Sequence, residues 1–346
     1  MKSKLGNIRT RLKRHEKGLK KHFKKASYFL VKCQISDPYV NSGTLRGSVC
    51  PWEIGAADTW GLTILEDFHD TLEAIWVWCY YTGITRKYTY EPNIDMAWKY
   101  ITTNFERFIP PDKEDEGLYD CSNVILCGSL YEKIFADKSY HEWIETAGNR
   151  LARYFLKIGA SPKDYSDWMV ESCWAWWLAS CLGHVAQFLG NNEWLEAAKV
   201  FVKRTVINEE EPFGSLEKEP HRIGPGDHDC FSCNANKVLA LLSCCPSNKV
   251  IEKIIVNRFL PLIPKHFVKR EVDENAWNAN VAMALGKSYL ATRKEGFLPS
   301  YFAIMEELER RDIQKSSALP RSEYFKARES WVTFFYAYAY ASVISN

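Results

Sequence analysis

A two-helix unit that recurs along the chain is the feature that most limits its fold. Each unit opens with an acidic or polar turn, continues as an apolar helix rich in aromatic residues, passes a short break and ends in an amphipathic helix. The units begin at Asp70, Asp120, Asp167, Asp229 and Glu274, which lie 50, 47, 62 and 45 residues apart. A period of this length with two helices per unit is typical of helical repeat proteins.

The two ends of the chain supply the parts of one more hairpin. A sixth apolar helix, predicted over 329–344, has no partner after it, and an amphipathic helix within residues 5–30 is left over at the other end. If these two helices pair, six hairpins close into a ring. We therefore predict that residues 5–30 pack against the C-terminal helix.

The two helices of each unit have different apolar patterns. The first is apolar almost all round, as in 174–177 and 334–340, and a helix with no polar face belongs in a core. The second carries a stripe, such as Trp143, Ala147 and Leu151 with charges between them, and belongs outside. The prediction is an all-α (α/α)6 toroid, with a basic helical segment over 1–40 and a single toroid domain over 41–346.

Composition places the chain among ordinary globular proteins, because 46% of its residues are hydrophobic and 25% are charged. The uncharged stretch 172–191 contains Ser, His, Gln and Gly, so it is interpreted as a buried helix rather than a membrane span. Eleven cysteines without a signal-type apolar segment near the start favour free thiols in the cytoplasm. Aromatic residues make up 14% of the chain, and such residues often line clefts for sugars or isoprenoids.

Charge is concentrated at the start of the chain. Residues 1–25 hold eleven Lys and Arg against the single Glu16, a net charge of +10, which leaves −8 on the remaining 321 residues. An anionic membrane surface facing residues 2–25, a nucleic acid or the acidic body of the protein could each be the partner. The apolar stripe Ile8, Leu12, Leu19 and Phe23 favours a solvated helix that packs on the body. No aromatic stacking platform accompanies the charges, which argues against nucleic acid.

Three hairpin segments, 80–101, 134–155 and 188–201, carry a resemblance to a known group of proteins. They read YYTGITRKYTYEPNIDMAWKYI, IFADKSYHEWIETAGNRLARYF and FLGNNEWLEAAKVF. With the toroid pattern over residues ~50–345, the chain resembles the six-hairpin glycosidase superfamily, which includes unsaturated glucuronyl hydrolases. The resemblance implies a carbohydrate-active hydrolase whose catalytic carboxylates lie at the mouth of the ring. Terpenoid cyclases and prenyltransferases share this ring, so an isoprenoid cyclase and a non-catalytic binding scaffold remain alternatives.

Four aspartates, Asp70, Asp120, Asp167 and Asp229, precede or open a predicted inner helix. Asp is a preferred N-cap, so each of the four could serve only to cap the start of a helix. In a ring, however, the inner N-termini meet at one mouth, where gathered acids push one another's pKa values apart and can act as acid and base. Asp167 and Asp229 form the favoured pair, since Asp164 and Asp227 make their turns dense in acid.

Further candidate residues lie near the unit starts. Trp52, Trp60, Trp168 and Trp277 could stack on a sugar ring or an allyl cation, or pack in the core.

His228, between Asp227 and Asp229, is the candidate catalytic histidine. His228, Cys230 and Cys233 have a spacing that a zinc ion could use, but buried thiols explain them without one, so no metal or cofactor is expected. Pro and Gly residues in 209–226 predict a loop over the mouth.

Overall fold

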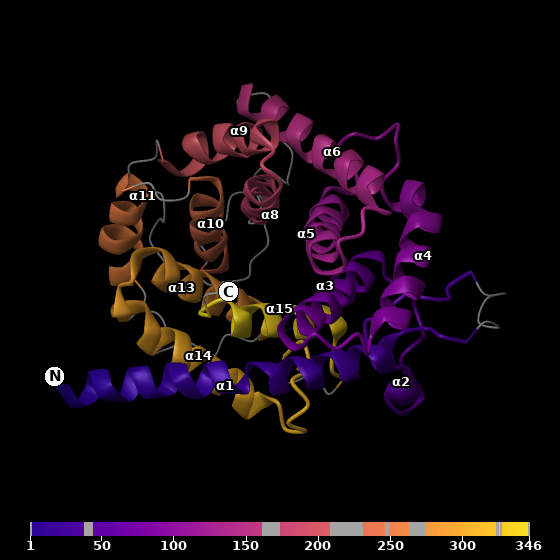
Figure 1. Ribbon diagram of the computed structural model, residues 1–346, viewed down its shortest axis with the longest axis horizontal. Helices are drawn as coiled ribbons and strands as arrows, with labels where there is room; N and C mark the ends of the chain where they lie inside the picture. The colour runs from indigo at the N-terminus through magenta and orange to yellow at the C-terminus, as the bar shows by residue number, and fades with distance from the viewer. Residues whose placement is uncertain are drawn as a thin grey trace.

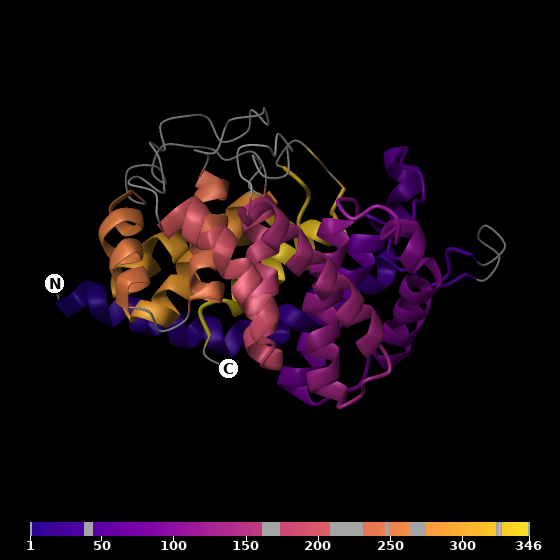
Figure 2. The same ribbon diagram turned by 90° about the horizontal axis from the view of Figure 1, so that it is seen from above.

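The computed structural model describes residues 2–37, 44–160, 174–207, 231–245, 249–262, 275–322, 325 and 327–344. These residues form two concentric rings of helices around one axis (Figure 1), and Figure 2 shows the same helices turned by 90°. The inner ring consists of α3 (Phe68–Thr85), α5 (Leu118–Phe135), α8 (Trp174–Leu189), α10 (Phe231–Cys244), α13 (Asn275–Thr292) and α15 (Ser330–Ala341). The outer ring consists of α1 (Lys2–Cys33), α4 (Glu91–Phe108), α6 (His141–Ala160), α9 (Asn192–Val202), α11 (Lys249–Ile254) and α14 (Leu298–Arg311). The predicted (α/α)6 toroid is confirmed.

Smaller elements complete the described part of the chain. Single π-helical turns extend α9 and α11, at Lys203–Ile207 and Ile255–Phe259. Short 3₁₀ turns occupy Leu260–Leu262 and Glu295–Phe297. The short helix α2 (Ile54–Trp60) was not predicted from the sequence. Only isolated β-bridges occur among the described residues, in agreement with the predicted all-α fold.

The ends of α3 show how the sequence sets an inner helix. Asp67 caps it by accepting a hydrogen bond from the backbone N–H of Asp70. Arg86 ends it in the left-handed conformation, with its N–H bonded to the carbonyl of Thr82. Every residue from Asp70 to Thr82 is buried, so the helix is covered on all sides and tertiary packing is what stabilises it.

Outer helices approach their neighbours through small residues. Gly148 of α6 lies against Trp194 of α9, and a Cβ at this glycine would come within 2.2 Å of the indole ring. The indole nitrogen Nε1 of Trp194 donates a hydrogen bond of 2.8 Å to Asn149. A glycine at position 148 therefore lets a large buried ring fill the space between two outer helices.

The first and last helices close the ring. The rings of His15 and His22 on α1 stack on Tyr340 of α15 with centroid distances of 3.7 and 4.2 Å. The hydroxyl of Tyr301 and the carbonyl of Tyr340 each lie 2.9 Å from His15 Nε2. The predicted contact between the N-terminal segment and the C-terminal helix is therefore observed, and Figure 1 shows α1 running outside α15 and α3.

The apolar stripe of α1 and some of its charged residues make contacts within the molecule. Leu19 and Phe23 are buried in the core. Arg11 pairs with Glu306, and Lys32 lies 2.9 Å from Glu53. The acidic body of the protein is thus one partner of this basic helix. Among the described residues, no helix combines the length and apolar character needed to cross a membrane.

Aromatic side chains fill the middle of the ring. Trp76 of α3 stacks on Tyr338 at 4.6 Å and meets the edge of Phe334, both on α15. Trp177 of α8 packs on Phe335 at 5.3 Å. This aromatic layer separates the two ends of the ring, each of which contains a cavity. Every cysteine whose side chain is described is a free thiol.

Candidate functional site

The N-terminal ends of five inner helices form a circuit of contacts around one mouth of the ring. Ring centroids lie 5.3 Å apart for His69–Tyr119, 4.9 Å for Tyr119–Trp174, 5.1 Å for Trp174–Trp277 and 6.4 Å for Trp277–Trp331. Ser330, beside Trp331, closes the circuit by a hydrogen bond to Asp70. The convergence of inner N-termini that the sequence predicted therefore holds for α3, α5, α8, α13 and α15.

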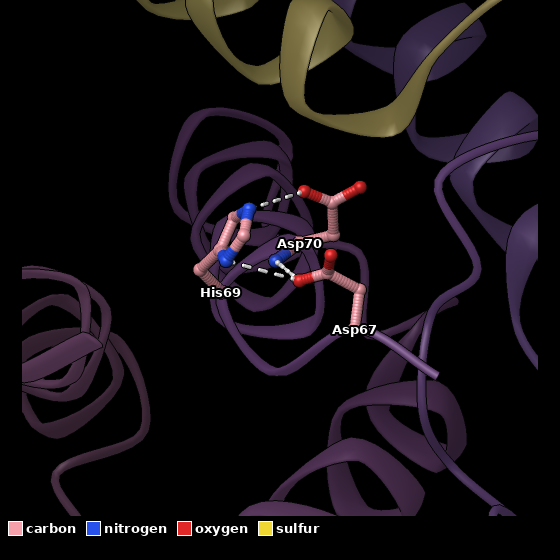
Figure 3. Close-up of side chains that lie close together, drawn as sticks. All are labelled: Asp67, His69 and Asp70. Carbon is pink, nitrogen blue, oxygen red and sulfur yellow. Dashed lines mark hydrogen bonds and ion pairs between the residues drawn. The ribbon is translucent and has the colours of Figure 1, made fainter. Parts of the chain in front are cut away.

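An imidazole surrounded by carboxylates lies at the α3 end of this mouth (Figure 3). His69 Nδ1 lies 3.1 Å from Asp67 Oδ1, and His69 Nε2 lies 3.3 Å from Asp70 Oδ1. From α5, Asp120 Oδ1 lies 3.9 Å from the same Nδ1 atom. Asp67 Oδ1 and Asp120 Oδ1 are both near one nitrogen, so at most about 7 Å separates them. Hydrolysis by two carboxylates uses separations of about 5 to 9.5 Å.

Burial makes ionisation of these acids costly. Asp70 is 1% exposed, and desolvation, followed by repulsion from Asp67, raises its pKa well above the usual range. Desolvation likewise raises the pKa of Glu73, whose Oε1 accepts a hydrogen bond of 2.9 Å from Tyr119. Both carboxyl groups therefore favour the protonated form.

The Ser330 hydroxyl contacts two oxygens, Asp70 Oδ2 and the carbonyl oxygen of Cys50 at 3.1 Å. Burial has the larger effect on the pKa of Asp70 and raises it, whereas the hydrogen bond from Ser330 acts in the opposite direction.

Asp67 and Asp120 have environments that differ from that of Asp70. Burial raises the pKa of Asp67, but His69 and two backbone N–H groups favour its charged form. Burial raises the pKa of Asp120 to about 7, against a lowering by His69. Asp120 Oδ1 is buried and accepts no hydrogen bond, so no hydrogen bond offsets the cost of burying its charge there. Three neighbouring acids thus have three different tendencies to ionise.

A cavity of about 250 Å³ opens onto the cluster. Its lining residues are Pro51, Asp67, His69, Asp70, Tyr119, Trp174 and Trp331. The ligand atoms of Asp67, His69 and Asp70 lie within 4.8 Å of one another, and such a set of oxygen and nitrogen donors could also bind a divalent cation. The cavity therefore combines titratable groups with indole walls, a surface suited to a sugar ring.

Two of the four predicted catalytic aspartates, Asp70 and Asp120, are brought together here. The capping alternative is wrong for both. Asp67 caps α3, and Gly117 occupies the cap position of α5, because its left-handed φ of 67° suits glycine. Asp70 and Asp120 instead lie in the first turns of these helices.

The aromatic candidates have different positions. Trp277 belongs to the circuit at the mouth and is 9% exposed. Trp52 is half-buried and forms an isolated bridge with Glu329 at the start of α15. The side chains of Trp60 and Cys233 lie outside the described part of the chain, as do the loop 209–226 and the residues Asp164, Asp167, Trp168, Asp227, His228, Asp229 and Cys230.

Sequence reasoning missed Asp67 and His69. The signal was present in the sequence, because residues 66–70 read Glu-Asp-Phe-His-Asp, a turn as dense in acid as Asp227-His228-Asp229. The criterion that favoured Asp167 and Asp229 applies equally to this turn. The apolar pattern starts the unit at Asp70 and so places Asp67 and His69 outside the helix, which is why these two residues are not among the predicted sites.

Comparisons with known proteins gave a result at the level of structure alone. No family model and no curated protein sequence matches the chain. The GH76A α-1,6-mannanase of Salegentibacter sp. HEL1_6 superposes with a TM-score of 0.62 at 10% identity, over 94% of this chain and 98% of the mannanase. A variant of that mannanase with two consecutive aspartates changed to asparagine is described as inactive and was solved with α-1,6-mannotriose. An unsaturated glucuronyl hydrolase specific for heparin gives 0.62 at 14% identity, over 95% and 97% of the two chains. The chain therefore has the (α/α)6 toroid fold of the six-hairpin glycosidases.

Proposed function

We propose that this protein is a glycoside hydrolase that uses Asp120 and Asp67 as its pair of carboxylates. The observation that carries the proposal is the placement of both groups within 4 Å of one imidazole nitrogen, where Asp67 and His69 line a cavity with aromatic walls. Two carboxylates with different proton affinities on either side of a sugar are what hydrolysis of a glycosidic bond requires.

Asp120 is the proton donor in this proposal. A pKa of about 7 leaves the carboxyl group partly protonated at neutral pH, so it can give a proton to the leaving oxygen. Asp67 is the ionised partner, because a backbone N–H and His69 stabilise its charge. It would act on the opposite side of the sugar ring, as the base for water or as the nucleophile.

The remaining residues of the cluster position these two groups. Asp70 lies 3.3 Å from His69 Nε2 and orients the ring whose Nδ1 atom faces Asp67 and Asp120. The structurally similar mannanase depends on two consecutive aspartates, whereas this chain contains no such pair anywhere. The proposed pair therefore comes from two helices, α3 and α5, rather than from one turn.

The acidic residues that line the cavity support a sugar over an isoprenoid. An isoprenoid cyclase would be expected to have a deep apolar cavity with one buried acid, whereas this cavity has two aspartates and a histidine in its lining. A scaffold in which each aspartate only caps a helix does not account for Asp70 and Asp120, since neither is a cap. The mannanase and the glucuronyl hydrolase place α-1,6-mannosides and unsaturated uronides among the sugars to be tested.

The test is hydrolysis of a substrate panel by the wild type and by Asp67→Asn and Asp120→Asn. The panel holds α-1,6-mannooligosaccharides, unsaturated glucuronyl oligosaccharides and a polyene isoprenoid, with release of reducing ends or cyclised product as the readout. Each variant should lose about 10²- to 10⁴-fold in rate on the sugar that the wild type hydrolyses. Asp67→Asn should still cap α3, because Asn caps a helix about as well as Asp.

Asp112→Asn, in an exposed loop, is the matched control and should retain full activity. Thermal unfolding of each variant separates loss of chemistry from loss of fold. A double variant, Asp67→Asn with Asp120→Asn, that hydrolyses the same sugar at the wild-type rate would refute the assignment. Turnover of the polyene alone would refute the glycosidase proposal as a whole.

A further inference from the structure

A second cavity lies at the end of the ring opposite the mouth. It has a volume of about 300 Å³, within the range of small-molecule sites, and the later turns of α3, α5, α8, α13 and α15 line it. The aromatic layer that contains Trp76 and Phe334 separates it from the Asp67–Asp120 site. It is therefore a separate site with its own chemistry.

Two lysines give this cavity a positive character. Lys133 and Lys287 are among its lining residues, and none of the described residues that line it is acidic. Lys287 Nζ donates a hydrogen bond of 3.0 Å to the hydroxyl of Tyr338 and lies 4.8 Å from the centre of its ring. Lys133 Nζ lies 5.1 Å from the ring centre of Phe188. Within the described part of the chain, neither ammonium group pairs with a carboxylate.

His184, another lining residue, lies close enough to Lys287 and Lys133 for the charges of both to act on it. The two lysines therefore face one space.

The walls of the cavity suit a hydrocarbon better than a sugar. Trp76 is stacked on Tyr80 at 5.1 Å and on Tyr338 at 4.6 Å, so its faces are occupied. The rings of Tyr338 and Phe188 each carry a lysine over one face. Because a sugar needs an open aromatic face to stack on, these rings offer it little. The other apolar lining residues are aliphatic, namely Leu126, Leu130, Leu290, Ala341 and Ile344.

We propose that this second cavity binds a small amphiphilic carboxylate. Its carboxylate group pairs with Lys287 and Lys133, and its hydrocarbon chain lies among Leu126, Leu130 and Leu290. Such a ligand would place its charge beside two lysines that have no carboxylate partner among the described residues, and its chain against the apolar lining.

The proposal is tested by calorimetric titration of the full chain with octanoate, hexanoate and octanol. Octanoate should bind, and hexanoate more weakly, by about three- to fourfold for each methylene removed. Octanol, which has no charge, should bind at least tenfold more weakly than octanoate. Lys287→Met and Lys133→Met keep the apolar stem and remove the charge, so each should weaken octanoate binding about tenfold.

Two control variants locate the effect. Lys99→Met changes an exposed lysine on α4 and should leave octanoate binding unchanged. Asp120→Asn should also leave it unchanged, which separates this proposal from the proposed hydrolase activity. Absence of octanoate binding, equal binding of octanol, or unchanged affinity in both the Lys287→Met and Lys133→Met variants would each overturn the proposal.

Discussion

Replacement of Asp120 by asparagine should make the protein more stable at alkaline pH while it abolishes hydrolysis. Asparagine has nearly the shape of aspartate but never carries a charge. Asp120 Oδ1 accepts no hydrogen bond in the folded chain, and desolvation is the main cause of its raised pKa. The substitution therefore removes a cost that the native charge imposes on the fold.

The size of this cost follows from the two pKa values. The pKa of the Asp120 carboxyl rises from 3.8 to about 7 on folding, and each pKa unit corresponds to about 1.4 kcal/mol. Between these pH values the folded chain holds a proton that the unfolded chain has released. The free energy of unfolding therefore falls as pH rises through this window, by about 4 kcal/mol in all.

Urea denaturation of the wild type and of Asp120→Asn from pH 4 to pH 8 measures this difference. The two proteins should have similar stability near pH 4, where the folded chain keeps Asp120 protonated and the unfolded chain has released that proton only in part. Above pH 7 the variant should be more stable by up to about 4 kcal/mol. Asp70 and Glu73 contribute to the pH dependence of both proteins, so the difference between the two curves isolates Asp120.

Asp112→Asn, in the exposed loop before α5, serves as the control and should follow the wild-type curve at every pH. Parallel curves for the wild type and Asp120→Asn would refute the reasoning. Such a result would show that the Asp120 charge costs the fold nothing, and that its pKa is not raised towards the value needed for a proton donor.

Two more predictions concern packing at α1 and between outer helices. Burial lowers the pKa of His22 from 6.5 to about 3, so the unfolded chain alone gains this proton as pH falls from 6.5. As pH falls from 7 to 5, the free energy of unfolding should drop by about 2 kcal/mol less in His22→Gln than in the wild type. Urea denaturation at the two pH values measures this, and equal drops would contradict the lowered pKa. Gly148→Ala should cost about 1–3 kcal/mol in thermal or urea unfolding, because the new methyl group meets the Trp194 ring. Gly55→Ala, where the methyl group meets no atom within 4 Å, is the control. Equal stability of the two variants would show that α6 and α9 can move apart to accommodate the methyl group at no cost.

The pattern of apolar residues was sufficient to predict the rings of helices. Helices that are buried on all sides, such as α3, cannot lie anywhere but in the inner ring, and striped helices such as α6 must face both core and water. Helix ends were predicted less well. The start of α3 is set by the cap at Asp67, and an apolar pattern does not contain that information.

The site was predicted only in part, because proximity between helices is a property of the folded ring. Asp70 and Asp120 were identified from the sequence. Their contact with one imidazole depends on which helices are neighbours at the mouth, and the sequence pattern does not contain that information. The roles of Asp167, Asp229 and His228 stay predictions, as does contact between residues 2–25 and an anionic membrane. The division into 1–40 and 41–346 also stays a prediction, since contact between two parts does not show whether either folds alone.

The pairing of α1 with α15 gives the protein an unusual problem during its synthesis. His15 and Tyr340 are 325 residues apart in the chain, and translation at 5–20 residues per second takes roughly 15 to 65 seconds to cover that distance. Throughout this time His15 and His22 of α1 lack the ring of Tyr340 on which they stack in the folded protein. The ring cannot close until its last helix leaves the ribosome. Until then the earlier hairpins form an open arc, and the face of α1 that α15 later covers is exposed and can aggregate.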